Sequence, residues 1–141
     1  MIVQGQTTSF KKELYLGVHD LDTDTIKIAL YTGFADLNLD TTVYTTTNEI
    51  TGTGYTAGGK PLTVTQVPVG DLTNNTAYVS FAPVVWTGAS FTARCALIYN
   101  SNTNASVCVL DFGSDKTNTQ AGTFTVTFPT ATSTSAIIRF N

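Results

Sequence analysis

The sequence has few charged residues: they occupy 12% of its 141 positions, about half the share of an ordinary globular domain. The formal net charge is −3, and no segment is rich enough in lysine and arginine to follow a phosphate backbone, so nucleic-acid binding is not expected. No apolar run approaches the roughly 18 residues of a membrane-spanning helix. The first residues lack a basic segment followed by an apolar one, so we expect no secretory signal.

Cysteine and histidine are also scarce, with two cysteines and one histidine in the chain. At their spacing these residues are too few for a metal site. Cys95 and Cys108 lie in strand-like runs on either side of a turn-like segment. Cys95 shares the alternation of Phe91, Ala93 and Leu97, which is typical of a small core side chain. We predict two buried free thiols, and a disulfide is the alternative if the two strands pair.

No group of residues in the sequence predicts catalysis or a bound cofactor. His19 is followed by Asp20, but a catalytic triad also needs a nucleophile close by in space, and no G-x-S-x-G motif occurs. The acidic residues are few and scattered, without a pair suited to acid–base chemistry. We therefore interpret His19 as a helix-end or surface histidine, and the chain as a protein that is not an enzyme.

Three aspartates, Asp20, Asp22 and Asp24, have the spacing that begins a calcium-binding loop. Such a loop needs glycine at its sixth position and glutamate at its twelfth, where this chain has Thr25 and Tyr31. We predict an acidic surface turn here, with weak binding of a divalent metal as the alternative.

Threonine is the abundant residue, with 28 copies, and its β-branched side chain favours strands. Apolar residues alternate with threonine in several short runs separated by turn residues. The strand-like runs are residues 26–31, 62–66, 78–81, 91–99, 107–112, 124–128 and 136–140, with a short one at 43–44. We predict an all-β domain of seven to eight strands, arranged as an antiparallel β-sandwich or jelly-roll-like fold.

One helix is predicted near the N-terminus, over residues 9–18. Ser9 is suited to cap its first turn, Phe10, Leu14 and Val18 fall on one face, and Gly17 marks its end. Residues 1–8 precede it and read as a flexible arm. The predicted organisation is therefore an N-terminal arm, 1–8, followed by a single domain, 9–141.

Residues 52–59, GTGYTAGG, hold four glycines around one tyrosine. A phosphate-binding loop would lead into a helix whose N-terminal amides point at the anion. Here a Lys-Pro pair and then a strand-like run follow the glycines. We predict a structural bend in which Gly54, Gly58 and Gly59 supply backbone angles, with the ring of Tyr55 packed inward.

Several phrases of the chain, in order and along nearly its whole length, resemble a family of small virion proteins of tailed bacteriophages. They are FKKELYLGVHD, IKIALYT, YTTTNEITGTGYTAGGKPLTV, YVSFAPVVWTGASFTARCALIYN, VLDFGSDKT and FTVTFPTATSTSAIIR. The resemblance implies a non-enzymatic structural role in the virion, assembled in the cytoplasm of a bacterial host. It supplies no functional residues.

We interpret the chain as a capsid decoration, or cement, protein that bridges subunits of the major capsid protein and stabilises the head. The alternatives are a tail, neck or fibre-associated virion protein or a receptor-binding module, and, from another class, a small hydrolase or lectin-like binder. We expect a homo-oligomer, a trimer first and a dimer second. The candidate interface residues are apolar positions that no regular strand buries, together with a tryptophan suited to core or surface: Leu37, Leu39, Val43, Tyr44, Trp86 and Ala89.

Overall fold

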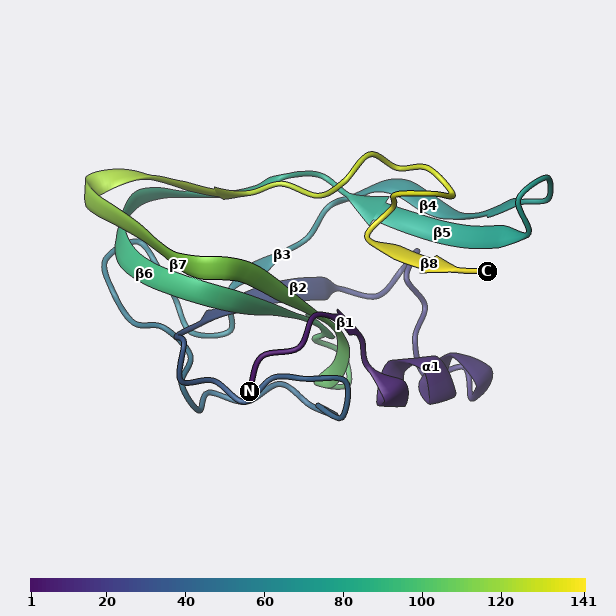
Figure 1. The fold of residues 1–141 in the computed structure, drawn as a ribbon, viewed down its shortest axis with the longest axis horizontal. Helices are drawn as coiled ribbons and strands as arrows, with labels where there is room; N and C mark the ends of the chain where they lie inside the picture. Colours follow the sequence, from purple (N-terminus) through teal and green to yellow (C-terminus); the bar gives the residue numbers. More distant parts are fainter.

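The computed structural model describes all 141 residues as eight strands and one helix (Figure 1). In chain order the elements are β1 (Gly5–Gln6), α1 (Thr8–Tyr15), β2 (Ile26–Tyr31), β3 (Lys60–Pro61), β4 (Val64–Asp71), β5 (Thr76–Phe81), β6 (Val84–Asn100), β7 (Ala105–Val126) and β8 (Ile138–Phe140). They form two antiparallel sheets, with strand orders β1-β7-β6-β2-β3 and β4-β5-β8. The predicted all-β class with one short helix is confirmed, and the arrangement is sandwich-like.

The β6–β7 hairpin is the longest feature of the fold. Its strands of 17 and 22 residues pair from the Asn100↔Ala105 end to the Val84↔Val126 end, where the sequence predicted separate short strands. Register shifts interrupt the pairing around Ala89. Bulges of this kind bend a strand pair and increase its twist. The hairpin therefore bends back at one end of the molecule and continues in the second layer, as Figure 1 shows.

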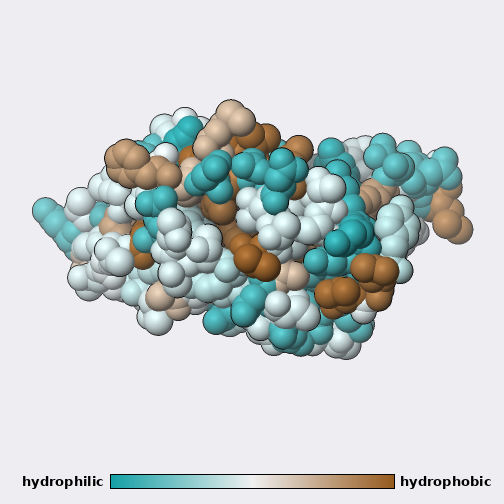
Figure 2. Space-filling view, turned by 90° about the horizontal axis from the view of Figure 1, so that it is seen from below, coloured by the Kyte–Doolittle hydropathy of each residue, from teal (hydrophilic) through white to brown (hydrophobic).

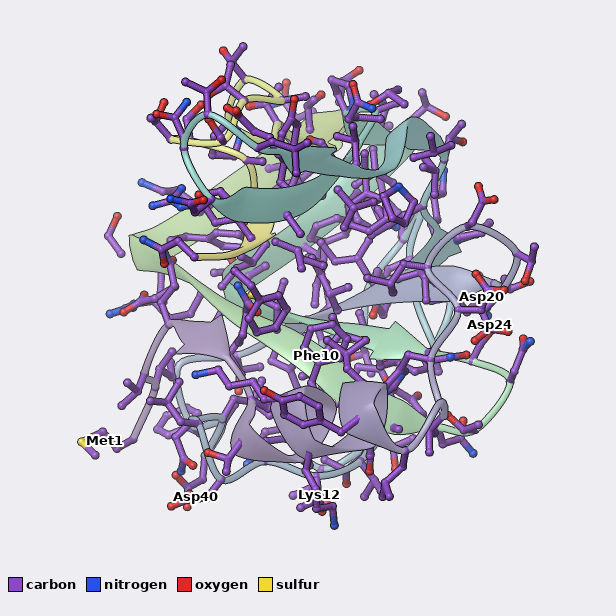
Figure 3. All side chains as sticks on the ribbon, turned by 90° about the vertical axis from the view of Figure 1, so that its right-hand side faces the viewer. Met1, Phe10, Lys12, Asp20, Asp24 and Asp40 are labelled. Carbon is purple, nitrogen blue, oxygen red and sulfur yellow. The ribbon has the colours of Figure 1, made fainter.

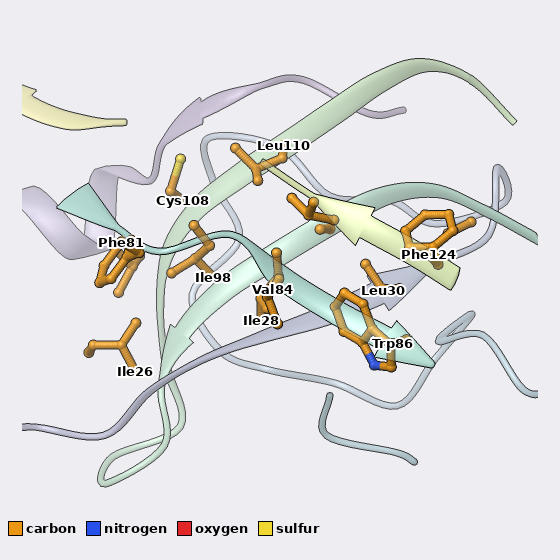
Figure 4. Packing of buried hydrophobic residues seen from close by; sticks show 14 of the residues in the cluster. Ile26, Ile28, Leu30, Phe81, Val84, Trp86, Ile98, Cys108, Leu110 and Phe124 are labelled. Atoms are coloured by element: carbon orange, nitrogen blue, oxygen red, sulfur yellow. The ribbon is translucent and has the colours of Figure 1, made fainter. Parts of the chain in front are cut away.

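The main core lies between the two layers and contains 21 buried residues. Trp86 and Phe124, from the upper half of the hairpin, lie over Ile28 and Leu30 of β2 (Figure 4). The rings of Trp86 and Phe124 are 6.0 Å apart at 71°, an edge-to-face arrangement that adds about 0.5–1.5 kcal/mol to the burial of their surfaces. This aromatic contact joins the returning half of the hairpin to the sheet below it.

A second, smaller core of eight residues covers the opposite face of the large sheet. Ala29 and Tyr31 of β2 contribute to it, together with Ala35 and Leu37 from the loop that follows. Since β2 contributes side chains to both cores, five of its six residues are buried. This two-sided burial explains the nearly continuous apolar sequence of the strand.

Helix α1 differs in its ends from the predicted helix. It begins at Thr8, and the hydroxyl of Thr7, not of Ser9, accepts a hydrogen bond from the Phe10 amide. Phe10 is the only buried residue of the helix. The helix ends at Tyr15, so Val18 lies outside it and does not extend the Phe10 face. The error concerns the cap: threonine and serine both suit the position, and the hydroxyls of Thr7 and Ser9 both lie within hydrogen-bond distance of Ser106, but Thr7 alone accepts from the Phe10 amide.

Residues 1–8 are not the free arm that the sequence suggested. Gly5 and Gln6 form β1, which pairs with Val109 and Cys108 of β7. Ahead of this strand, the Val3 amide donates a 2.9 Å hydrogen bond to the Leu37 carbonyl. The segment is part of the large sheet because it supplies hydrogen-bond partners to an otherwise open stretch of the β7 edge.

The two cysteines are buried and free, as predicted. Cys95 pairs in register with Asp111, and Cys108 pairs with Ile98, so the two thiols are not opposite one another. They also belong to different cores on opposite faces of the sheet. The predicted common alternation of Cys95 with Phe91 and Ala93 is wrong, because the register shift between Ala93 and Cys95 reverses the faces.

We expect both thiols to be unreactive in the folded protein. Burial raises the pKa of Cys95 to about 11 and that of Cys108 to about 12, so at pH 8 neither is a thiolate. A thiol-specific chromogenic reagent should therefore label neither cysteine in buffer and both in denaturant. Reducing agent should leave the melting temperature unchanged. Rapid labelling of the native protein, or a melting temperature lowered by reductant, would contradict this arrangement.

A second prediction concerns the corner of the hairpin, where Gln120 and Ala121 have φ of 58° and 54°. This conformation costs a residue with a Cβ atom about 1–2 kcal/mol, and glycine adopts it freely. Ala121→Gly should raise the free energy of unfolding by about 0.5–1 kcal/mol in urea titrations. The matched control is Ala77→Gly, at an exposed strand position without positive φ, which should lower it by a similar amount. A destabilised Ala121→Gly variant would mean that the corner is not strained.

Candidate interaction surface

The residues predicted for an interface separate into two groups. Leu37, Trp86 and Ala89 are buried in the two cores, so the prediction that they form a contact surface is wrong. Leu37 belongs to the smaller core, and Ala89, which pairs with Gly122 of β7, belongs to the main core. Leu39 and Val43 are exposed, and Tyr44 is half-buried, with its ring stacked 4.6 Å from that of Tyr99.

The glycine-rich loop leads into β3, not into a helix, and two of its predicted structural glycines, Gly54 and Gly59, lie against backbone. Gly54, Gly58 and Gly59 have φ of 84°, 89° and 68°. A Cβ atom on Gly54 would lie 2.7 Å from the Gly88 carbonyl oxygen, and one on Gly59 would overlap the Ile28 carbonyl. Both close approaches therefore require glycine at these two positions.

Glu49 holds this loop in place through three hydrogen bonds, a role that the sequence analysis did not identify. Its Oε1 accepts hydrogen bonds from the Tyr55 hydroxyl at 2.6 Å and from the Gly58 amide at 2.7 Å. Its Oε2 accepts one from the Tyr44 hydroxyl at 2.7 Å. Burial, followed by the hydrogen bond to Glu49, raises the pKa of Tyr55 far above its usual range. A lone carboxylate among threonines and tyrosines was the available signal.

His19 is buried beside the end of α1, so of its two predicted settings the surface one is wrong. Its Nε2 lies 2.8 Å from Glu13 Oε2, and its Nδ1 lies 3.3 Å from Asn100 Nδ2. Asn100 Nδ2 also donates to Asp24 at 2.6 Å. Because the Asn100 nitrogen is a donor, His19 Nδ1 is an acceptor and Nε2 carries the proton directed at Glu13. The histidine therefore links the end of α1 to the β6–β7 turn.

Two of the three aspartates of the acidic turn, Asp20 and Asp24, accept local hydrogen bonds. Asp20 Oδ1 accepts from the amides of Asp22 and Thr23, and Asp24 Oδ2 accepts from the Asp20 amide. Hydrogen bonds from Thr23 and Asp22 hold the pKa of Asp20 below its usual value. No group of three or more histidine, cysteine, aspartate or glutamate side chains converges as metal ligands would.

The main surface depression lies between α1 and β8, at the end of the molecule away from the hairpin corner (Figures 1 and 3). It consists of two adjoining pockets of about 680 and 510 Å³ that share Leu14 and Phe140 in their walls. We name it the α1–β8 trough and define it by Leu14, Phe140, Gln6, Lys11, Arg139 and Asp20. Its apolar wall is fixed from behind, because Phe140 stacks on the buried Phe10 with ring centres 6.1 Å apart.

The charged side chains of the two pockets have opposite sign. Lys11 and Arg139 line the first pocket, and Asp20 lines the second. None of the three takes part in the ion pairs of this structure. Gln6 bridges the two sheets here, since its Nε2 donates a 2.8 Å hydrogen bond to the Arg139 carbonyl. Its Oε1 is buried and has no donor, which is unusual for a buried polar atom.

Further apolar side chains are exposed near this end of the molecule. Tyr15 and Leu16 extend past the last turn of α1, and Val67, Val69 and Leu72 lie on β4 and its turn. On the face seen in Figure 2, apolar groups are separate and the surface between them is polar or nearly neutral. The sequence did not single out the trough, because its walls come from positions far apart in the chain.

No protein-family model, curated protein or solved structure matches this chain. Among the helices of the structure, none has the length and apolar character needed to cross a membrane.

The glycine loop generates a further prediction. Gly59→Ala should lower the free energy of unfolding by about 3 kcal/mol or more, because a Cβ atom there overlaps backbone and φ is positive. Gly70→Ala is the matched control: it lies in β4 without positive φ and with open space around it, so it should change stability little. Inorganic phosphate and ATP should leave the melting temperature of the wild type unchanged. A phosphate-dependent increase would identify the loop as an anion site.

Proposed function

We propose that this chain is a structural protein of a tailed-phage virion, most specifically a head decoration protein that binds the major capsid protein. The α1–β8 trough carries the proposal: it is a preformed depression with an apolar wall and unpaired charges at both ends, on a domain with few charges elsewhere. The resemblance of the sequence to small virion proteins supplies the biological setting. Concave apolar sites with a few polar groups are the ordinary form of binding sites.

The mechanism of such a protein is mechanical. Two cores, on either side of one sheet, hold the domain in a single shape. A rigid subunit loses little conformational freedom when it binds, so more of its contact energy is retained as affinity. Repeated over a shell, many modest contacts add together because the sites on one particle are linked. The low charge of the surface also reduces the desolvation cost of contact with neighbouring subunits.

Self-association belongs to the same proposal. A trimer, or alternatively a dimer, around a local symmetry axis of the shell would place equivalent troughs at equivalent positions on the lattice. Of the predicted interface residues, Leu39, Val43 and Tyr44 are the ones accessible for such contacts. The oligomeric state stays a prediction, which sedimentation of the purified protein measures directly.

Quantitative mass spectrometry of purified particles, separated into heads and tails, tests the proposal. We expect the chain in the head fraction, in a copy number comparable to that of the major capsid protein. Particles that lack it should lose their DNA at a lower temperature than complete particles. A location restricted to tails, or a copy number that fits a single ring, would replace the decoration role with the tail or neck alternative.

A further inference from the structure

We propose that the α1–β8 trough binds an extended segment of a partner polypeptide, in which an apolar side chain lies between a basic and an acidic residue. The apolar side chain enters the pocket walled by Leu14 and Phe140, the basic residue lies toward Asp20, and the acidic residue lies toward Lys11 and Arg139. This inference rests on the proposed function, under which the partner is the major capsid protein.

The apolar pocket determines which side chain of the partner segment the site binds. The pocket of about 510 Å³ extends from Leu14 and Phe140 to Val79 and Ile138 of the second sheet. Its volume lies in the range of ordinary binding sites, and seven of its eleven lining residues are hydrophobic. Burying one leucine-sized side chain contributes about 1.5–3 kcal/mol. The pocket therefore provides an anchor for an aliphatic side chain.

The charges determine the direction of the segment. The cations Lys11 and Arg139 line one pocket and the anion Asp20 lines the other, and Leu14 and Phe140 line both. Each lacks an ion-pair partner within the chain. A segment with its charges in the complementary order gains attraction at both ends, and one with the reverse order is repelled at both. Exposed charges of this kind determine orientation and specificity more than affinity.

The backbone of the segment also has partners. Strand β8 is at the edge of its sheet, with β5 as its only neighbour. An extended chain is the form of ligand that binds beside such an edge. The Arg139 carbonyl of β8 already accepts a hydrogen bond from Gln6, which holds this edge against β1.

Strand β4 of a second copy of this chain does not supply the required segment, although Val67 and Val69 are accessible on it. That strand carries one acidic residue, Asp71, and no lysine or arginine. Strand β4 therefore has the apolar and the acidic residue that the trough would bind, but it lacks the basic residue that would lie toward Asp20. The complementary segment belongs to a different polypeptide.

Selection of short random peptides on the full-length protein tests this site. We expect enriched peptides to contain a large aliphatic residue with lysine or arginine on one side and aspartate or glutamate on the other. Amide chemical shifts of the protein should change around Leu14 and Phe140 when a selected peptide is added. Lys11→Glu should weaken its binding at least about threefold, and exchange of the peptide's acidic residue for lysine should restore binding to this variant.

The control variant is Lys116→Glu, an exposed charge reversal on β7 outside the trough, which should leave affinity unchanged. Circular dichroism and melting curves confirm that both variants fold. Absence of the charge pattern among enriched peptides, shift changes elsewhere on the molecule, or failure of the charge exchange would overturn the inference. So would self-association that Lys11→Glu abolishes, because the occupant would then be a second copy.

The outcomes also separate this inference from the proposed function. If the protein binds such peptides but is found in tails, the decoration role alone is overturned. If it is found in heads but binds no such peptide, this site alone is overturned.

Discussion

The pairing of β6 with β7 through both layers is the constraint on which the other elements depend. The register shifts around Ala89 turn the hairpin over, so that Trp86 and Phe124 lie above β2 and close the main core. The same strands provide the platform for β1 and β2 on either side. The chain that leaves β7 at Val126 also delivers β8 to the edge beside α1. The trough is thus a consequence of how the hairpin bends.

Elements that depend on a local alternation of apolar and polar residues were predicted correctly from the sequence. The face on which a side chain lies was predicted wrongly where the strand register shifts. Residues 26–31 were identified from their apolar pattern, and a helix was expected close to its true position. The bulge between Ala93 and Cys95 has no signal in composition, yet it exchanges the faces of the following residues. Leu37 was assigned to the surface because it lies in a polar loop, and it is buried because that loop covers the second face of the sheet.

The candidate site was less predictable than the fold for a physical reason. Residue type and spacing identify sites whose groups are close in sequence, as for the glycines of the 52–59 loop. The trough joins Gln6, Leu14 and Arg139, which come together only when two sheet edges meet beside the helix. Glu49 was overlooked for a different reason: its partners Tyr44, Tyr55 and Gly58 lie within nine residues of it, but their spacing corresponds to no motif. The trough is therefore created by tertiary contacts, and the Glu49 site by the local path of one loop.

The neutral surface and the charged trough have complementary effects on binding. Threonine hydroxyls make a soluble surface without long-range charge, so non-specific electrostatic attraction to other molecules is weak. Against this background, Lys11, Arg139 and Asp20 provide a local pattern that a partner can distinguish. The stacking of Phe140 on Phe10 and the Gln6 bridge hold the walls in place before any partner arrives. Specificity can therefore come from a few preorganised groups, while affinity on a lattice comes from repetition.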